Sequence, residues 1–446
     1  MRSTSKSRWF AVVVFFLFML LHQADKLLIG PLTTPIMETF GIDEAQMGAV
    51  FTGALIVGAV LYPLWGYLYD RYARAKLLAL ASFIWGATTW LSAIAPTYPS
   101  FLATRASTGI DDSSYPGLYS LIADYFGPNV RGKIYGLLQL SGPLGYLVGM
   151  VMALMLRDTI QAFLAGFGII VESWRGVFIV TGALGIVISI LILIGVREAP
   201  RGRSEPEMAD LETIGVYRFD WKIAKDLFRK RSLLLIFVQG FFGVFPWNVI
   251  TYWFFRYLET ERGYSADSVL FTMAPTILVL AAGYFVGGAI GDFFFRRTPG
   301  GRLIVSSVAV LLGAVLLTLT LKTPVENPGL FQGLLMLTAL FIPFAAANVL
   351  ASIYDISLPE VRSTAQAVES FIENAGATVA PLLAGLIAVE SSLQNAILII
   401  CVSTWVICSI FLAAAARLVP EDIRTLRSQM RDRADAERAA QGAIPG

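Results

Sequence analysis

Charge is what this sequence has least of. Only 15% of its 446 residues are charged, against about 25% in an average soluble domain, and the mean hydropathy is +0.67. Apolar runs of about 20 residues, the length that crosses a bilayer as a helix, fill most of the chain. The scarcity of charge excludes a soluble globular protein and predicts an all-α membrane protein. A net charge of +2 gives no reason to expect a nucleic-acid partner.

Groups used in catalysis and metal binding are also scarce. The chain has one histidine and two cysteines. Cys401 and Cys408 lie ~10 Å apart along one predicted helix, too far for a disulfide. We find no H-E-x-x-H or G-x-S-x-G signature and no GxxxxGK[ST] loop. We therefore expect no enzyme activity, no cofactor or metal, and no use of ATP as the energy source.

The apolar runs predict twelve transmembrane helices. The expected spans are 9–32, 46–69, 77–95, 99–125, 133–156, 175–196, 232–255, 268–293, 303–321, 329–354, 364–389 and 394–416. The long polar segment 198–231 divides them into two six-helix bundles, 1–197 and 232–418, and a charged, helical tail follows over 419–446. Apolar and basic residues alternate at 221–230, which fits either a helix on the membrane surface or a solvated linker.

Two stretches repeat about half a chain apart. Residues 124–131 (DYFGPNVR) and 355–362 (DISLPEVR) share Asp, Pro, Val and Arg, and each lies between two apolar runs. Less strictly, 66–74 (GYLYDRYAR) is echoed by 288–297 (GAIGDFFFRR). An internal repeat of this kind is the usual plan of a secondary transporter, so the two bundles are expected to be pseudo-symmetric.

Lys and Arg predict the orientation. If the N-terminus is cytoplasmic, 27 of the 34 Lys and Arg residues fall on the cytoplasmic side. This bias is what the positive-inside rule requires. We expect both termini in the cytoplasm, most simply in a plasma membrane, and a monomer.

The stretch 66–76 (GYLYDRYARAK) resembles the loop 2–3 signature of the major facilitator superfamily, with Ala73 where that family usually has Gly. The runs 141–149 (SGPLGYLVG) and 174–178 (WRGVF) resemble its fifth span and the start of its sixth. Asn374, Gly376, Pro381 and Gly385 are similar to the partner span 11. The resemblance covers the whole chain and implies the fold of that superfamily.

The N-terminal half is most similar to the Spinster-like branch. Asp25-Lys26 matches its Asp-Arg pair on span 1, and 105–115 (RASTGIDDSSY) resembles its span-4 pattern R-x-x-x-G-x-G-E-A-S-Y. Asp111 stands where that pattern has Gly, and Asp112 where it has Glu. Span 11 does not follow the branch. The resemblance implies a lipid-like substrate.

Ionisable side chains within the spans are candidates for function, because they are expensive in a bilayer. Asp25 lies ~24–26 Å from the cytoplasmic edge and Arg105 ~9 Å from the other edge, so they share a depth in a core of ~30 Å. We expect them to pair and to act as a proton switch, although a purely structural ion pair is the alternative. His22 could tune or relay the proton, or be an ordinary hydrogen-bonded histidine.

A substrate cavity is expected to draw on both halves. On span 4, Arg105, Thr108, Asp112 and Tyr115 follow helical spacing as one polar stripe, with Asp111 turned away. On span 11, Glu373 is a substrate contact, a second protonation site or a buried structural Glu. The aromatic residues of span 7 can line a pocket or only pack. The predicted cavity residues are His22, Lys26, Asp112, Tyr115, Gln139, Trp247, Asn248, Asn348, Glu369 and Glu373.

The repeated motifs predict gates on the cytoplasmic side. Asp70 is expected to pair with Arg131 and to favour the positive N-terminus of span 11. By resemblance, the gating residues are Gly66, Asp70, Arg71, Arg74, Asp124 and Arg131 in one half and Asp292, Asp355 and Arg362 in the other.

These observations predict a secondary active transporter that works by alternating access and is coupled to protons. Its substrate would be an amphiphile such as a lysophospholipid. The alternatives are a proton symporter for a small organic anion, with Arg105 and Lys26 as ligands, and a drug or metabolite exporter. A channel is disfavoured because the repeated gate motifs imply closure on one side.

Overall fold

The computed structural model describes residues 5–442, apart from 113, 127–133, 135–136, 139, 200–228 and 358–361. Over these residues the chain is helical and contains no strand, which confirms the all-α prediction. Eleven helical segments in the described part are long and apolar enough to cross a membrane. They correspond to eleven of the twelve predicted spans, and the remaining one, 99–125, is divided into shorter pieces.

The chain forms two compact units. The first comprises 1–217, 248–274 and 377–396, and the second comprises 218–247, 275–376 and 397–446. The boundaries pass through three long helices, so that one end of each of these helices packs with the first unit. The predicted division into sequence halves at 198–231 stays a prediction.

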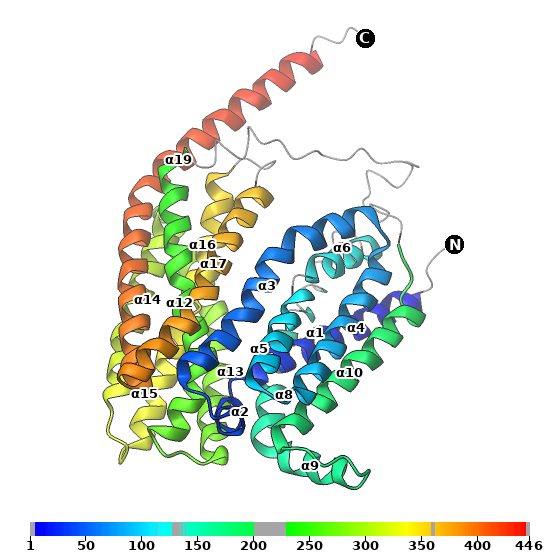
Figure 1. The fold of residues 1–446 in the computed structure, drawn as a ribbon. Helices are drawn as coiled ribbons and strands as arrows, with labels where there is room; N and C mark the ends of the chain where they lie inside the picture. The colour runs from blue at the N-terminus through cyan, green and yellow to red at the C-terminus, as the bar shows by residue number, and fades with distance from the viewer. Residues whose placement is uncertain are drawn as a thin grey trace. The chain divides into compact units, whose positions relative to one another are not determined.

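The first unit is built mainly from the N-terminal helices (Figure 1). They are α1 (Ser5–Leu28), α2 (Thr33–Phe40), α3 (Glu44–Arg71), α4 (Arg74–Ile94), α5 (Tyr98–Ser107), α6 (Tyr115–Tyr125), α8 (Ser141–Val151), α9 (Arg157–Ala165) and α10 (Ser173–Gly195). A short 3-10 turn, η1 (Thr108–Ile110), follows α5, and a π-helical segment, η2 (Met152–Leu156), joins α8 to α9.

Helix α1 carries His22, Asp25 and Lys26, and α4 and α10 supply the hydroxyl groups of Thr89 and Thr181 that bind Asp25. Helix α1 packs on α8 at Gly149, where a Cβ atom would come within 2.6 Å of the Ala24 carbonyl oxygen. Only glycine allows this approach. An apolar cluster around Phe15, Phe18 and Trp85 fills one end of the bundle. Asp25 is thereby placed one residue beyond a tight backbone contact, which fixes its position.

Most of the C-terminal helices belong to the second unit. The C-terminal helices are α12 (Arg231–Thr260), α13 (Ala266–Phe295), α14 (Gly301–Lys322), α15 (Pro328–Phe341), α16 (Phe344–Ile356), α17 (Arg362–Glu390), α18 (Leu393–Ile397), the π-helical η5 (Leu398–Val402) and α19 (Ser403–Gly442). Of these, only α12, α13, α17 and α18 are divided between the two units. Helix α19 continues through Pro420 to Gly442, which confirms a helical tail over most of 419–446.

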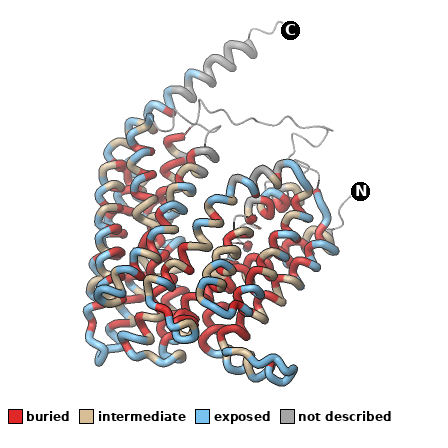
Figure 2. The backbone as a smooth tube through the Cα atoms, in the orientation of Figure 1, coloured by how far each residue is buried: buried red, intermediate tan, exposed pale blue. Residues whose placement is uncertain are grey.

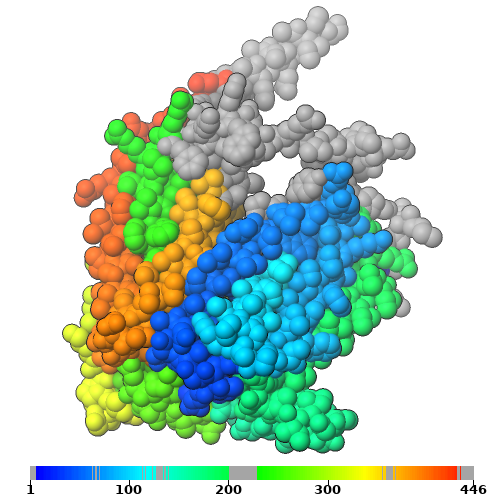
Figure 3. Space-filling view, in the orientation of Figure 1, coloured from blue at the N-terminus to red at the C-terminus, as the bar shows by residue number. Residues whose placement is uncertain are grey.

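One end of α12 and one end of α17 belong to the first unit and pack against α3. Trp253 donates to the Pro381 carbonyl at 3.0 Å, and Thr52 of α3 donates to the Thr378 carbonyl at 2.8 Å. Phe51 and Tyr252 stack with ring centres 4.6 Å apart. The orange surface of α17 lies directly against the blue surface of α3 (Figure 3). This end of the first unit is therefore closely packed.

Helix α9 differs from the rest of the first unit. Most of its residues are exposed (Figure 2), and large apolar side chains in and after it, Phe163, Phe167 and Ile170, are not covered. Side chains of this kind favour a membrane interface over water. The prediction that 157–174 lies at the membrane surface remains a prediction.

Candidate functional site

The fourth predicted span is broken where its acidic residues lie. Helix α5 ends at Ser107, η1 ends at Ile110, and α6 begins at Tyr115. The predicted continuous stripe from Arg105 to Tyr115 is therefore wrong: Asp111 and Asp112 lie on non-helical backbone. Irregular backbone at this depth is tolerated only where its polar groups find partners.

Two hydrogen bonds pair backbone carbonyl groups of the broken segment. The Trp65 indole donates to the Ile110 carbonyl at 2.5 Å, and the Ser114 amide donates to the Asp111 carbonyl at 2.9 Å. Gly109 lies so close to α3 that a Cβ atom would meet the Ala54 carbonyl oxygen at 2.0 Å. The break is thus held in place by α3, and it turns the two neighbouring aspartates in different directions.

Asp112 faces a small cavity in the first unit and pairs with Lys26. The Lys26 Nζ atom lies 2.7 Å from Asp112 Oδ2. The cavity, of about 30 Å³, has room for about one water molecule. It is lined by the charged or titratable side chains of His22, Asp25, Lys26, Arg105, Asp112 and Tyr252, together with apolar residues and Thr108. Side chains of both charge signs thus border this cavity.

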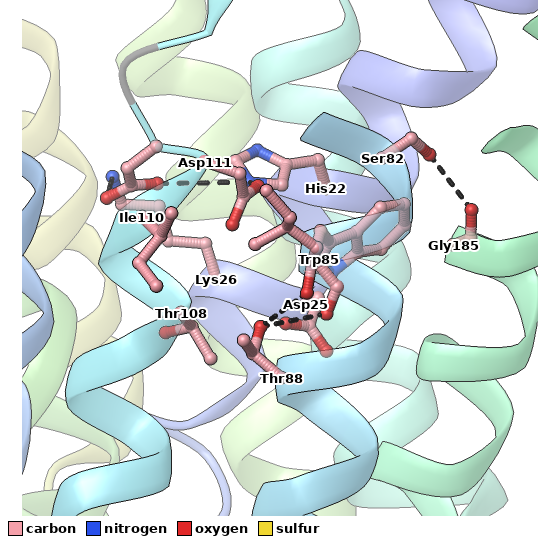
Figure 4. A network of polar contacts seen from close by, with 12 residues as sticks. His22, Asp25, Lys26, Ser82, Trp85, Thr88, Thr108, Ile110, Asp111 and Gly185 are labelled. Atoms are coloured by element: carbon pink, nitrogen blue, oxygen red, sulfur yellow. Dashed lines mark hydrogen bonds and ion pairs between the residues drawn. The ribbon is translucent and has the colours of Figure 1, made fainter. Parts of the chain in front are cut away.

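Asp111 is turned into the protein. Its side chain is 0% exposed, and its Oδ2 atom lies 2.7 Å from His22 Nε2. His22 Nδ1 lies 2.6 Å from the Tyr115 hydroxyl. Figure 4 shows Asp111 facing the His22 ring across the broken segment. His22 lines the cavity, whereas Tyr115 and Asp111 do not.

Asp25 and Arg105 are brought together, but loosely. The Arg105 Nη1 atom lies 3.9 Å from Asp25 Oδ2. Asp25 instead accepts from the Thr181 hydroxyl at 2.7 Å and from the Thr89 hydroxyl at 3.1 Å. Two of the guanidinium nitrogens of Arg105, Nε and Nη1, are buried without a hydrogen bond, although the group lies over the Phe178 ring. Arg105 is a buried cation that has bonding capacity to spare.

The second unit has a larger polar cavity, of about 350 Å³. Its size falls within the range of small-molecule sites, about 300–1,000 Å³. Glu369 and Glu373 of α17 line it, with Gln366 and Ser370 from the same helix face, and Trp247, Tyr284 and Trp405 add aromatic rings. Glu369 is 6% exposed. Among the residues that the structure describes, none of those lining this cavity is a cation.

Besides Tyr115, two predicted cavity residues lie elsewhere. Asn348 donates to the carbonyls of Gly287 and Phe344 at 3.1 and 2.9 Å, and so joins α13 to α16. Asn248 is buried and lines neither cavity. Gln139 lies outside the described residues.

At the gate motifs, an arginine in each unit binds the aspartate of the repeated stretch. Arg74, at the start of α4, donates to Asp124 and to Ser120 at 2.9 Å. It also binds Glu198 at 2.8 Å and the Ala199 carbonyl at 2.7 Å. Glu198 accepts in addition from the Ala75 amide. Sequence reasoning missed Glu198, which carries no motif and reaches Arg74 only through the fold.

In the second unit the corresponding arginine is Arg302, at the start of α14. It binds Asp292 at 2.6 Å and also Asp355. In the sequence repeat, Arg296 and Arg297 were taken as the counterparts of Arg74. This interpretation is wrong, because Arg302 makes the corresponding contact and Arg297 lies over the Phe293 ring. Arg71 is exposed at the end of α3. Arg131 lies outside the described residues, and so do the surroundings of Gly66 and the side chains of Asp70 and Arg362.

Two cations hold the ends of the segment that joins the sequence halves. Arg74 binds the Ala199 carbonyl, and Lys230 donates to the Ile356 carbonyl at 2.6 Å. Burial lowers the pKa of Lys230, and the nearby Asp422 carboxylate partly offsets this effect. Each end of the segment is thus fixed to its own unit by a cation on a backbone carbonyl.

A helical membrane fold with two buried polar cavities and repeated arginine–aspartate contacts defines a transporter. Residues 14–331 match the family model of the Major Facilitator Superfamily. The chain belongs to this superfamily.

Known proteins with which the chain aligns include Protein spinster of Drosophila melanogaster. The two are 29% identical over 401 residues, which cover 86% of this chain and 63% of the fly protein. The D-galactonate transporter of Escherichia coli is 24% identical, over 86% of this chain and 90% of that protein. Among solved structures, a bacterial homolog of the human lysosomal transporter Spinster, in an inward-facing and unoccupied conformation, matches with a TM-score of 0.77 and 19% identity. That match covers 96% of this chain and 99% of the other. The twelve-helix fold and the resemblance to Spinster proteins are thereby confirmed.

Proposed function

We propose that this transporter works by alternating access, is coupled to protons, and moves an amphiphile such as a lysophospholipid. We further propose that it acts as a monomer in the plasma membrane with both termini in the cytoplasm, as the distribution of Lys and Arg suggests. The observation that carries the proposal is the cavity of the first unit, where Arg105 and Lys26 lie beside Asp25 and Asp112.

The two cations are suited to the anionic group of a substrate. Arg105 has buried nitrogen atoms without hydrogen bonds, and a phosphate or carboxylate could accept from them in a bidentate manner. Lys26 is already bound to Asp112. An anion can therefore engage Lys26 fully only when Asp112 is neutralised, and this competition supports coupling between proton and substrate.

Asp25 is the proposed proton-coupling residue, with Arg105 as its partner. In the present arrangement the carboxylate is held by two threonine hydroxyls and by a distant guanidinium. A loose ion pair needs little rearrangement to separate. Separation would leave Asp25 with the two threonine hydroxyls as its partners, and we propose that it takes up a proton in that state.

The cavity of the second unit favours the amphiphile over a small organic anion. It combines two carboxylates with aromatic rings, and no cation lines it among the described residues. When these carboxyl groups are ionised, an anion would be repelled there, whereas an ammonium group would be attracted to both the carboxylates and the rings. The organic-anion alternative keeps one supporting observation, the similarity to a D-galactonate transporter.

Uptake into proteoliposomes under an imposed pH gradient tests the proposal. Labelled lysophosphatidylcholine should accumulate above the level of protein-free liposomes, and unlabelled sugar acids should not compete. Arg105→Ala should abolish the uptake, whereas Arg157→Ala, which alters an arginine on the exposed helix α9, should not. Accumulation of a sugar acid without lysophospholipid uptake would establish the organic-anion alternative instead.

A further inference from the structure

The carboxylate of Asp111 is buried beside a histidine and has no permanent cation of its own. Its side chain is fully buried. The partner that the described residues provide is His22, with Nε2 at 2.7 Å. A buried carboxylate without a counter-charge is strongly unfavourable. The pair formed by Asp111 and His22 must therefore hold a proton, on the ring or on the carboxyl group.

The charged side chains around Asp111 form a cluster, and its other members are already matched in ion pairs. Lys26 pairs with Asp112 at 2.7 Å, and Arg105 pairs with Asp25 at 3.9 Å. The cluster thus contains three carboxylates and two permanent cations, all in the first unit. The remaining titratable groups are His22 of α1, Tyr69 of α3, Tyr115 of α6 and Tyr252 of α12. A phenol is neutral below about pH 10, so one added proton makes the cluster neutral, and the imidazole is more basic than the carboxylates that could take that proton instead.

The hydrogen-bonding geometry accommodates a doubly protonated ring. A carboxylate can only accept, so a proton on the Nε2 atom would lie toward an acceptor, Asp111 Oδ2, 2.7 Å away. The other nitrogen, Nδ1, faces the Tyr115 hydroxyl at 2.6 Å, and a hydroxyl can accept as well as donate. Neither nitrogen faces a group that must donate. Trp85 of α4 packs edge-on against the ring with centroids 5.5 Å apart and keeps it in place.

The same nitrogen is also near the cavity. His22 Nε2 lies 3.9 Å from Asp112 Oδ1, which is too long for a hydrogen bond but within reach of one bridging water. Asp112 lines the cavity and holds Lys26. The imidazole therefore lies between a carboxylate sealed in the protein and a carboxylate that borders the cavity.

We propose that the His22–Asp111 pair is a second proton site, which holds one resident proton on the imidazole ring and exchanges it with the cavity through Asp112. In the exchange step the Nε2–H bond breaks and an O–H bond forms on Asp112, which leaves a neutral imidazole and a neutral carboxyl. Lys26 then loses its carboxylate partner and becomes available to an anionic group. The role of this step in transport rests on the proposed function, whereas the resident proton does not.

The composition of the chain makes the resident proton directly observable. His22 is the only histidine in the sequence, so protein labelled with ¹⁵N-histidine and purified through a histidine-free tag gives one imidazole in an NMR spectrum. A free histidine is about one-tenth protonated at pH 7.5, since its ordinary titration lies near 6.5. We expect the imidazolium form of His22 to predominate at that pH. A neutral imidazole in the wild-type protein would overturn the proposal.

Matched variants identify the source of the charge. Asp111→Asn removes the buried carboxylate, and the imidazole should then be neutral at pH 7.5. Asp292→Asn also removes a paired aspartate, but in the second unit, and should leave the His22 spectrum unchanged. An imidazolium that persists in Asp111→Asn would contradict the assignment to this pair. The wild-type spectrum gives an independent answer if this variant does not fold.

A transport assay separates this inference from the proposed function. His22→Gln should lower proton-driven accumulation of lysophosphatidylcholine at least tenfold while exchange across the membrane without a gradient continues. If the wild-type protein shows no proton dependence but His22 is imidazolium, the coupling proposal fails and the resident proton stands. If transport is proton-driven and His22 is neutral, the inference fails and the proposed function stands.

Discussion

Both units contain the same kind of contact, an arginine bound to an aspartate, and in each unit the arginine also binds a second carboxylate. In each, an arginine at the start of a helix binds an aspartate at the end of another: Arg74 with Asp124, and Arg302 with Asp355. Arg74 is 2% exposed and also holds Glu198, whereas the Arg302 side chain is 14% exposed and also holds Asp292. The difference indicates that the contact of the first unit is part of its core and that of the second unit is closer to the surface.

The polar cavities differ in a second way. The cavity of the first unit is lined by carboxylates and cations and is almost filled. The cavity of the second unit is lined by carboxylates and aromatic rings and has open volume. We infer a division of tasks in which charge movement belongs to the first unit and selection of the substrate to the second. The predictions below test this comparison, from the largest expected effect to the smallest.

Replacing the arginine should affect the two units unequally. Arg74→Ala removes a buried cation from Asp124, which is 9% exposed, and from Glu198, which is 35% exposed, and loss of one partner of a buried pair costs about 3–5 kcal/mol. Arg302→Ala should cost about 1 kcal/mol or less, because its contact is partly solvated. Thermal unfolding of the detergent-purified proteins measures both. Equal losses of stability would remove the distinction between the two contacts.

Asp25→Asn should abolish proton-driven accumulation. The amide mimics the protonated carboxyl, so the variant should still bind substrate and exchange it between the two sides of the membrane. Glu373→Gln in the second unit is the control and should keep its response to the pH gradient. Accumulation and exchange are measured in the same liposomes. Wild-type accumulation by Asp25→Asn would place the coupling site elsewhere.

Glu369→Gln should weaken the binding of a substrate that carries an ammonium group. Loss of one charged partner of this kind is worth about 1–2 kcal/mol, or roughly 5- to 30-fold in affinity. The affinity for a lysophospholipid without an amine should change little. Competition binding with the two lipids gives the ratio directly. If both affinities fall equally, the carboxylate supports the cavity rather than selecting the headgroup.

The smallest expected difference concerns neighbouring residues. In a background with Cys401→Ser and Cys408→Ser, Asp112→Cys should react several-fold faster with a polar thiol reagent than Asp111→Cys. Asp112 lines the cavity, whereas Asp111 is sealed from it. Labelling rates followed by mass spectrometry provide the comparison. Faster reaction at 111 would mean that the broken segment presents its other side to the cavity.

Much of the fold could be predicted because apolar length and charge bias act locally. A transmembrane helix can be recognised from any stretch of about 20 apolar residues. The matching depths of Asp25 and Arg105 in the membrane follow from counting residues along the helices. The break after Ile110 was missed because the helical spacing of polar residues was read as a continuous helix. Gly109, the polar run 111–114 and Pro116 were the local signals against that reading.

Contacts that depend on the path of a loop could not be predicted. The turn before α14 is longer than the turn before α4, so Arg302, five residues after Arg297, takes the place that the sequence echo gave to Arg296 and Arg297. Glu198 meets Arg74 across 124 positions in the chain. Asp111 was expected to turn away from the polar stripe, and its histidine partner on α1 follows only from the tertiary packing.

The fixed ends of the segment between the sequence halves have a consequence for how this protein can vary. Arg74 holds the chain at Ala199, and Lys230 holds it again before α12. The residues from 200 to 229 can span up to about 100 Å if extended, and doubling a loop's length costs only about 0.6 kcal/mol in closure entropy. New sequence inserted between these anchors would therefore leave both units intact. In this chain, a regulatory element or a fused domain is best accommodated there.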